Sequence, residues 1–388
     1  MTTPTAAATP PPRRILVRGV NWLGDAVMTT PALQRLRQAF PDSHIALLTH
    51  EKLADLWRRH PSLDATLIFS PGERPWSVAR QLRQQGFQTA LVLPNSPRCA
   101  LEVWLARIPQ RVGYARAWRN WLLTQAVAPR PGQMRMPKRS VREVNRLVRL
   151  PAGALPPATR HSPHRTTHQI HDYLHLAAAL GANPDPLPPK LEIAPAEIQQ
   201  AEAELLSDWR PKVGASSPAN PLLLLGLNPG AEYGPAKRWP TERFAVVVRE
   251  VSRKIGNCLW LALGGAGDWP LCDEIARLAG GGVLNLAGKT SLRQLMALLK
   301  LCRVVLTNDS GPMHVAAALG TPVVVPFGST SPALTGPGLP GDPRHQLITS
   351  AAPCSPCFRR VCPIDFRCMA AISPDRVMEA VTQLLPAG

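Results

Sequence analysis

The 388-residue sequence contains no run of roughly 18 apolar residues, the length that a membrane-spanning helix needs. Its first residues, MTTPTAAATPPPRR, also lack the apolar core of a signal peptide. Cysteine is scarce as well, because the chain has eight, too few for a disulfide-built scaffold. These absences favour a cytoplasmic protein whose contact with any membrane is peripheral.

Acidic residues are few compared with basic ones. The chain has 26 Asp and Glu against 44 Lys and Arg, a formal net charge of +18. This balance favours an acidic partner, such as nucleic acid, an anionic membrane surface or a phosphorylated substrate. Aromatic residues make up only 5% of the chain and are not interleaved with basic residues as base-stacking platforms would be. We therefore expect no nucleic-acid partner.

Two nucleotide-binding motifs are incomplete. The stretch GVLNLAGKT resembles a P-loop, but Gly282 stands one position too early and a strand-like run replaces the loop. The stretch GGAGDWP has Pro270 where the third glycine of a dinucleotide fingerprint belongs. Both departures argue against an ATPase and a dinucleotide-dependent oxidoreductase.

The sequence does contain a regular alternation of short apolar runs and amphipathic stretches, which is typical of parallel sheets covered by helices. Its length exceeds the size at which one core keeps growing, so we predict an α/β protein with two Rossmann-like domains. The strands are expected in RILVR, HIALLT, ATLIFS, TALVLP, PLLLLGLNPG, CLWLALGG, VLNLAG, RVVLTNDSG and PVVVPFG.

Composition shifts suggest the domain limits. We expect a disordered tail over residues 1–13, an N-terminal domain over 14–182, a linker over 183–190 and a C-terminal domain over 191–388. Within the first domain, residues 129–169 form an insert rich in Pro, Arg and His. This insert is either a mobile surface loop with a basic face or a clamp for an anionic substrate.

The stretch RGVNWLGDAVMTTPALQRLR, residues 18–37, directly follows the first expected strand. Thr30 and Pro31 are typical of a helix N-cap and the first helical residue. Asp25 then lies in the loop before this helix, or in the first turn of a helix that begins earlier. Either way it lies near the carboxyl end of the strand, where parallel sheets bind ligands.

The stretch LNPGAEYGPAKRWP, residues 227–240, leads from a strand to a helix expected to begin at Pro240 or Thr241. Gly230 and Gly234 would let backbone N–H groups approach an anion, and Lys237 would add a positive charge. The loop therefore fits a diphosphate. The alternative is a loop that exposes a solvated Lys–Arg pair.

The stretch VVLTNDSGPMHVAAALGTPVV, residues 304–324, predicts a helix that opens near Pro312 and ends at Gly320. Its N-terminus, with the N–H groups of Ser310 and Gly311, is a ready anion site. Asp309 would contact a ribose or sugar hydroxyl, or would simply cap the helix. His314, one turn further on, is either a ligand contact or a half-buried histidine.

Four of the cysteines fall close together in PCSPCFRRVCPIDFRCM. Cys354, Cys357, Cys362 and Cys368 could hold a structural Zn²⁺ or an iron–sulfur cluster, although their spacing matches no standard ferredoxin pattern. Reduced thiols and a redox-labile disulfide are the alternatives.

The three ordered motifs, spread over about residues 14–335, resemble the ADP-heptose:lipopolysaccharide heptosyltransferases. The resemblance implies a GT-B fold, in which two Rossmann-like domains face an interdomain cleft. It also implies inverting transfer of a heptose from ADP-heptose to the inner core of lipopolysaccharide. A GT-B transferase with another nucleotide-sugar donor is the alternative.

The resemblance further implies roles for individual residues. Asp25 would be the general base, and Lys237 would stabilise the ADP leaving group together with the helix N-terminus at 309–311. No metal is needed for catalysis if these groups neutralise the diphosphate. The expected substrate-binding residues are Asn21, Gly24, Asn228, Gly230, Ala231, Thr290, Asp309, Ser310, Gly311 and His314, with Thr290 near the adenine.

The implied acceptor is an acidic glycolipid made of lipid A and the inner core, which would account for the basic N-terminal half. Each Lys or Arg near an anionic membrane contributes about 1 kcal/mol. The protein is therefore expected at the cytoplasmic face of the inner membrane as a peripheral enzyme.

Overall fold

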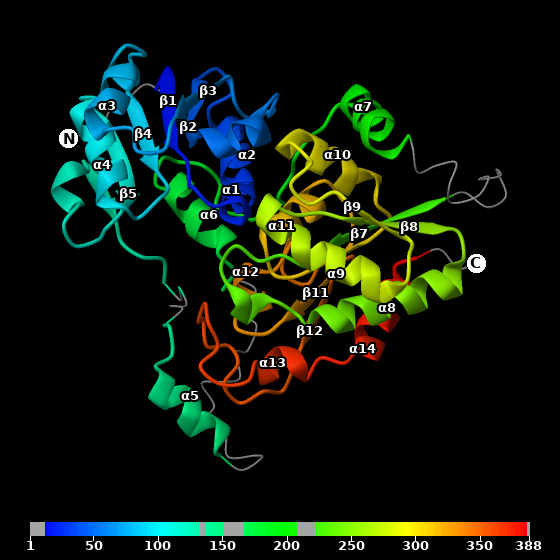
Figure 1. The fold of residues 1–388 in the computed structure, drawn as a ribbon. Coiled ribbons are helices and arrows are strands. Elements are labelled where there is room, and N and C mark those ends of the chain that lie inside the picture. The colour runs from blue at the N-terminus through cyan, green and yellow to red at the C-terminus, as the bar shows by residue number, and fades with distance from the viewer. Residues whose placement is uncertain (1–11, 132, 134–136, 151–166, 208–221, 386–388) are drawn as a thin grey trace, which may run out of the picture. The chain divides into compact units, whose positions relative to one another are not determined.

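The computed structural model describes residues 12–131, 133, 137–150, 167–207 and 222–385. The chain forms two compact units, each built around one parallel sheet (Figure 1). The first unit comprises residues 1–22, 29–131 and 170–187, and the second comprises residues 23–28, 132–169 and 188–388. The expected tail and the middle of the basic insert lie mostly outside the described residues, and the expected domain limits stay a prediction.

The sheet of the first unit has six parallel strands in the order β3-β2-β1-β4-β5-β6. The apolar residues of its central strands β1 and β4 are buried, as expected of a sheet covered on both faces. The strands are β1 (Arg14–Arg18), β2 (His44–His50), β3 (Ala65–Phe69), β4 (Thr89–Val92), β5 (Gln110–Tyr114) and β6 (Gln125–Val127).

The helices of the first unit cover this sheet. The helices α3 and α4 contact each other and bury Val78, Leu82 and Val103 in one apolar core with Leu16 and Val92 of the sheet. The helices α2 and α6 form a second contacting pair. The bounds are α2 (Thr30–Ala39), η1 (Glu51–Trp57), α3 (Pro75–Arg83), α4 (Pro97–Leu105), η2 (Asn120–Leu122) and α6 (Ile170–Ala178).

The second unit repeats the same topology. Its six parallel strands run in the order β12-β11-β10-β7-β8-β9, so the chain again starts in the middle, fills one side and crosses to the other. The strands are β7 (Leu223–Asn228), β8 (Cys258–Ala262), β9 (Val283–Asn285), β10 (Val305–Thr307), β11 (Val323–Phe327) and β12 (Gln346–Thr349).

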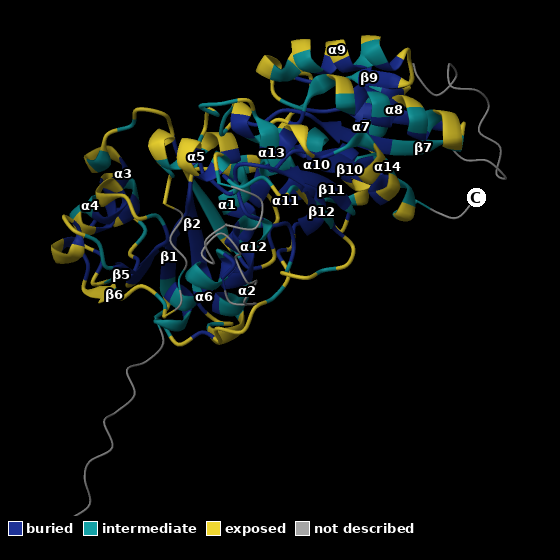
Figure 2. Cartoon of the chain, turned by 90° about the horizontal axis from the view of Figure 1, so that it is seen from below, coloured by how far each residue is buried: buried dark blue, intermediate teal, exposed yellow. Residues whose placement is uncertain are grey.

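The helices of the second unit pack in two groups. The helix α8 contacts α9 and α14, and the three share a core with Trp239 and Trp260; Figure 2 shows buried residues in dark blue. The helix α10 contacts α7 and α11. The bounds are α1 (Leu23–Met28), α5 (Val141–Val148), α7 (Pro195–Leu206), η5 (Pro235–Lys237), α8 (Thr241–Ile255), η6 (Ala266–Asp268), α9 (Trp269–Ala279), α10 (Leu292–Leu301), α11 (Gly311–Ala318), α12 (Pro332–Thr335), α13 (Arg367–Ala370) and α14 (Pro374–Gln383).

The predicted α/β class with two Rossmann-like sheets is confirmed. The predicted helix start at Thr241 is also confirmed, with Pro240 as the N-cap residue. The first motif differs in detail, because two helices replace one: α1 carries Asp25 in its first turn, and α2 begins at Thr30 with Thr29 as the N-cap residue. Pro31 is therefore the second helical residue rather than the first.

Candidate active site

The helix α1 belongs with the second unit because it packs closely on α11. A methyl group on Gly24 would lie 2.7 Å from Cδ2 of His314, and one on Gly311 would lie 2.9 Å from Cβ of Leu23. Both distances are shorter than side-chain contacts allow, so each helix presents a glycine where the other presents a side chain. This packing brings the first and third motifs together.

Asp25 lies in the first turn of α1 and is partly buried. Its Oδ1 accepts a hydrogen bond of 3.2 Å from the Gln169 side-chain amide. Burial raises the pKa of Asp25 above its usual 3.8, and the negative charge of Asp309 acts in the same direction. The bond from Gln169 and the positive charge of Lys237 oppose this shift. A carboxylate with a raised pKa is a stronger base than an exposed one.

Lys237 and Asp309 form an ion pair, with 2.7 Å between Nζ and Oδ2. The same Asp309 oxygen accepts a hydrogen bond of 2.5 Å from the Thr330 hydroxyl. The Lys237 ammonium also lies 4.9 Å from the centre of the Tyr233 ring. Asp309 is only 3% exposed, whereas the Lys237 side chain is 13% exposed. The cation is therefore the member of the pair that solvent or a ligand reaches.

A network of neutral side chains fixes the loops around this pair. Asn228, at the end of β7, donates from its amide to the Leu263 carbonyl oxygen and accepts from the Ser310 hydroxyl at 2.9 Å. Asn308 donates to the Pro229 carbonyl oxygen and accepts from the Trp239 backbone N–H. These bonds join the loops after β7, β8 and β10. The predicted substrate contact Asn228 is therefore 2% exposed and serves to position Ser310.

The helix α11 begins at Gly311, close to the predicted start, and anion binding there stays a prediction. Ser310 is the N-cap residue, but its side chain makes no capping bond because its hydroxyl is directed to Asn228. The helix N-terminus thus keeps its positive end available for an anion. His314 is buried, and burial lowers its pKa to about 3, so its ring is neutral at physiological pH.

Two glycines shape the loop after β7, and the predicted approach of an anion to its backbone stays a prediction. A methyl group on Gly230 would lie 2.5 Å from the Asp268 carboxyl group. Gly234 has φ of 146°, and a methyl group there would lie 2.5 Å from the Arg360 carbonyl oxygen. Ala231 is buried in the same loop. The loop is therefore held against residues 268 and 360. Lys237, near its end, pairs with Asp309.

Two predicted residues lie in other parts of the fold. Thr290 follows β9, an edge strand, and so is separated from the β7–β10 pair by β8. Asn21 lies in the first unit, where its side-chain oxygen is 3.5 Å from Nη1 of Arg18. Their predicted substrate contacts stay predictions.

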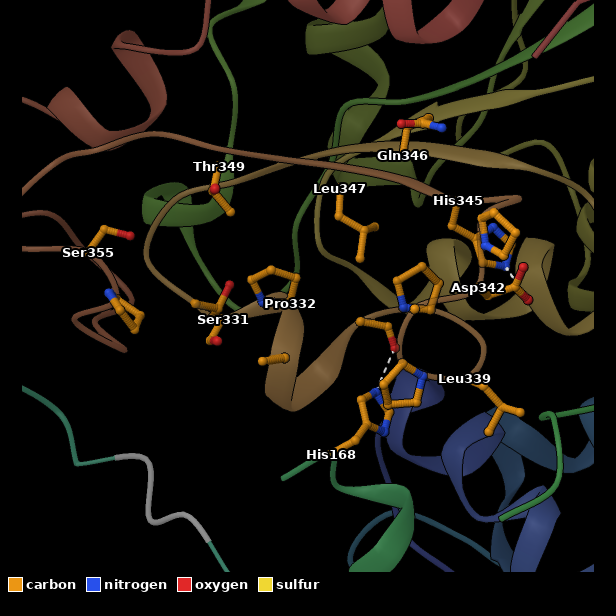
Figure 3. Close-up of a pocket in the computed structure, with 18 of the residues that line it drawn as sticks. His168, Ser331, Pro332, Leu339, Asp342, His345, Gln346, Leu347, Thr349 and Ser355 are labelled. Atoms are coloured by element: carbon orange, nitrogen blue, oxygen red, sulfur yellow. Dashed lines mark hydrogen bonds and ion pairs between the residues drawn. The ribbon is translucent and has the colours of Figure 1, made fainter. Parts of the chain in front are cut away.

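A pocket of about 750 Å³ is lined mainly by residues between Thr330 and Pro356 (Figure 3). Thr330, which donates to Asp309, lines it, as does His168, the residue before the Asp25 partner Gln169. Both ring nitrogens of the buried His345 lack a hydrogen-bond partner among the described residues. Burial lowers the pKa of His345 to about 4. Because the lining holds no Lys or Arg, the pocket suits a hydroxyl-rich ligand better than a phosphate.

The four clustered cysteines are free thiols. Burial raises the pKa of Cys354 and Cys357, and raises that of Cys368 to about 12, so these three are protonated at neutral pH. Val144 of α5 packs against Cys354 and Cys357. Among the residues that the structure describes, no group of three or more His, Cys, Asp or Glu is arranged to hold a metal ion. A structural metal here stays a prediction.

Sequence reasoning missed Gln169 and Thr330, the direct partners of Asp25 and Asp309. Gln169 is placed by its own backbone, which donates to the Leu334 carbonyl oxygen, and by the neighbouring His168, whose ring bonds the Gly336 carbonyl oxygen. No local pattern marks Gln169, because its partners are more than 140 residues away in either direction. Thr330 stands in a Ser/Thr-rich turn after β11, which is a signal that could have found it.

Comparison with known proteins identifies the family. The model of glycosyltransferase family 9 (heptosyltransferase) matches residues 132–366. Lipooligosaccharide heptosyltransferase 2 of Haemophilus ducreyi is 30% identical over 340 residues, which cover 84% of this chain and 86% of the relative. Lipopolysaccharide heptosyltransferase 2 of Salmonella typhimurium is 29% identical over 338 residues, which cover 84% and 85%.

Solved structures agree over nearly the whole length. The structure of E. coli ADP-heptose LPS heptosyltransferase II covers 96% of this chain and 98% of its own, with a TM-score of 0.69 and 26% identity. A family 9 glycosyltransferase from Veillonella parvula, at 24% identity, gives a TM-score of 0.75. This likeness confirms the GT-B assignment. Together with the family match, it shows that the chain belongs to glycosyltransferase family 9, the heptosyltransferases.

Proposed function

We propose that this enzyme transfers a heptose from ADP-heptose to the inner core of lipopolysaccharide with inversion at the anomeric carbon. The relatives named heptosyltransferase 2 and the similar E. coli enzyme, whose title names ADP-heptose, support this donor and this acceptor. The three motifs also resemble heptosyltransferase II more than other members of the family. The observation that carries the proposal is the placement of Asp25 beside the Lys237–Asp309 pair.

Asp25 is proposed as the general base. In a single displacement, the acceptor hydroxyl oxygen forms a bond to the anomeric carbon while its proton passes to the Asp25 carboxylate. The bond between the anomeric carbon and the diphosphate oxygen breaks, and its electron pair leaves with ADP. The raised pKa of Asp25 suits this role, because a base of higher pKa takes a proton more readily. Gln169 orients the carboxylate through its bond to Oδ1.

Lys237 and the N-terminus of α11 are proposed to neutralise the departing ADP. The ammonium of Lys237 is partly exposed beside the start of α11, and an anion there would bond to both. Charge-assisted hydrogen bonds of this kind stabilise by about 1.5 to 3 kcal/mol each. The chain's own residues thus supply the positive charge that a diphosphate leaving group requires.

The acceptor proposed here is an acidic glycolipid, and the protein's excess of basic residues matches it. Within the described part of the chain, no helix has the length and apolar character required to cross a bilayer. We therefore propose peripheral attachment at the cytoplasmic face of the inner membrane.

The test combines product analysis with nucleotide competition. ADP-heptose and a set of truncated lipopolysaccharide acceptors should give a product heavier by one heptose, and the acceptor that reacts identifies the core position. ADP should also raise the melting temperature more than UDP or GDP. Stronger protection by UDP or GDP, without transfer from ADP-heptose, would favour the alternative of another nucleotide-sugar donor.

A further inference from the structure

Five tryptophans of the first unit are exposed: Trp22, directly before α1, and four others between residues 76 and 121. The exposed fractions of these four are 86% for Trp118, 66% for Trp121, 59% for Trp76 and 40% for Trp104. Exposed tryptophans are unusual because each leaves a large apolar surface in water. These four lie on or beside α3, α4 and η2, and Figure 2 shows the exposed residues of α3 and α4 in yellow.

The fold places these side chains on neighbouring elements, since α4 contacts both α3 and η2. Arg98, near the start of α4, donates to the Glu73 carbonyl oxygen just before α3, and Arg83 at the end of α3 donates to the Leu105 carbonyl oxygen at the end of α4. The two helices therefore run side by side in the same direction. Trp76 extends from the first turn of α3, and Trp104 from the last turn of α4. Trp104 meets the Trp121 ring edge-on, with 5.8 Å between ring centres.

The loop before η2 turns Trp118 and Trp121 outward. Arg119, between them, is completely buried, and it donates to the Pro94 carbonyl oxygen at 2.5 Å. Trp118 has φ of 70°, a left-handed backbone conformation that residues other than glycine rarely adopt. The buried Arg119 and this backbone conformation fix the course of the chain at Trp118, whose side chain is 86% exposed.

The segment that carries these four tryptophans is strongly basic. Residues 74–130 contain nine arginines, no lysine and one acidic residue, Glu102, which is buried. Arg74, Arg80 and Arg107 are exposed on it, and Arg74 lies over the Trp76 ring. In this region, therefore, tryptophans stand among arginines, and Arg119 lies between Trp118 and Trp121. We name the four tryptophans with Arg74, Arg80 and Arg107 the Trp–Arg face.

We propose that the Trp–Arg face docks on the surface of an anionic lipid bilayer, and this proposal rests on the membrane-bound acceptor of the proposed function. Tryptophan rings settle at the level of lipid headgroups, and arginines pair with lipid phosphates. Contact with a second copy is disfavoured because it would place arginines against arginines. Binding of nucleic acid is disfavoured because the Trp104 and Trp121 rings pack on each other and leave no slot between them for a base.

The test is co-sedimentation of the full chain with vesicles of phosphatidylcholine, with and without phosphatidylglycerol and without any acceptor. Binding should need the anionic lipid. The double variant Trp118→Ser/Trp121→Ser should lose about tenfold in binding, whereas Trp269→Ser, an exposed tryptophan on α9, should lose little. Equal losses in these two variants would overturn the proposal.

Two variants that each remove three arginines from different places make the test more specific. The variant Arg74→Gln/Arg80→Gln/Arg107→Gln should lose roughly fivefold in binding for each arginine removed. The variant Arg142→Gln/Arg146→Gln/Arg149→Gln removes the same charge from the exposed side of α5 and should lose much less. Equal losses would show that only net charge matters. Dimerisation in sedimentation velocity, or tighter binding to single-stranded DNA than to vesicles, would also overturn the proposal.

Transfer to an acceptor stripped of its acyl chains separates the two proposals. The tryptophan variants should transfer heptose to this soluble acceptor at the wild-type rate. If no variant, including the wild type, transfers heptose while vesicle binding follows the expected pattern, the proposed function fails and the docking surface stands. If transfer is normal and vesicle binding is unchanged in every variant, the docking surface fails and the function stands.

Discussion

The two units have the same strand order, and in each the chain crosses between the central strands, β1 and β4 in the first unit and β7 and β10 in the second. Loops at such a crossing form the ligand site of an open parallel sheet. In the first unit, β1 ends in Arg18, whose guanidinium is buried 2.8 Å from Glu102 and 4.3 Å from the centre of the Phe69 ring. In the second, β7 ends in the neutral Asn228.

The difference shows how one topology supports two uses. At the first crossing, the positive charge of Arg18 is neutralised by a fully buried carboxylate, so it stabilises the fold and is closed to ligands. At the second crossing, the uncharged Asn228 and Asn308 fix the loops. The positive charge there is that of Lys237, which is partly exposed. Topology therefore predicts where a site can form, and the burial of the charged side chains favours the second crossing as the proposed anion site.

The largest expected effect is on Asp25. The variant Asp25→Asn should lower kcat by about 10²- to 10⁴-fold, because the amide cannot take the acceptor proton. Its affinity for ADP, measured by calorimetry, should stay near the wild-type value. Near wild-type turnover would remove Asp25 from the role of base.

The folded state of this variant provides the control. Because burial raises the pKa of Asp25, the ionised carboxylate favours unfolding, and stability that is full at low pH is lost as the pH rises through the raised pKa. At neutral pH the asparagine variant should therefore melt no lower than the wild type. A clearly lower melting temperature would mean that lost activity reports misfolding.

The next effect is expected at the first crossing, between β1 and β4, where Arg18 is buried. The variant Glu102→Leu leaves the buried Arg18 without its carboxylate and should lower the free energy of unfolding by about 3 to 5 kcal/mol, measured by urea denaturation. Arg253→Gln, which breaks an exposed pair with Glu250, should cause no measurable change. Affinity of the folded Glu102 variant for ADP should be unchanged. A loss of ADP affinity there would show that the first crossing takes part in donor binding.

A smaller effect is expected at the second crossing, between β7 and β10. The variant Lys237→Ala should weaken ADP binding by about 10- to 100-fold, the value of one charge-assisted hydrogen bond, and should slow turnover. The neighbouring Arg238→Ala removes an equal charge that lies 3.9 Å from Asp268, and should weaken ADP binding far less. Equal weakening by both variants would mean that the loop attracts ADP only by its overall charge.

The fold was largely predictable because its signals are local. The run RILVR forms β1 with the predicted limits, and Pro240 and Thr241 start α8 where the sequence indicates. The central strands are apolar runs flanked by loops rich in Gly and Pro, which is a strong pattern over a few residues. The η1 segment shows the limit of such patterns, since KLADLWRRH is amphipathic and yet forms a 3₁₀ helix.

The site was predictable in its charged residues and not in their partners. Lys237 and Asp309 follow β7 and β10, neighbouring strands of one parallel sheet whose carboxyl ends lie at the same edge. Asp25 follows β1 of the other sheet, and the helix α1 that carries it packs on α11. Gln169 reaches Asp25 across 144 residues, and Arg18 reaches Glu102 across 84, so neither contact leaves a local pattern. Gly24 has a role in packing that was not predicted, because its missing side chain makes room for His314. Its predicted contact with substrate stays a prediction.

The smallest expected effect is a shift in the pH dependence of turnover. Its direction tests how the charges of Lys237 and Asp309 change the pKa of Asp25. Turnover should rise with pH as Asp25 loses its proton, with a midpoint above 3.8, and His314 should add no step near neutrality because its pKa is about 3. The positive charge of Lys237 lowers the pKa of Asp25, so Lys237→Met should move the midpoint up. The negative charge of Asp309 raises it, so Asp309→Asn should move the midpoint down. Initial rates at saturating substrate across a pH series measure both shifts, and shifts of the same sign would mean that Asp25 does not sense the ion pair.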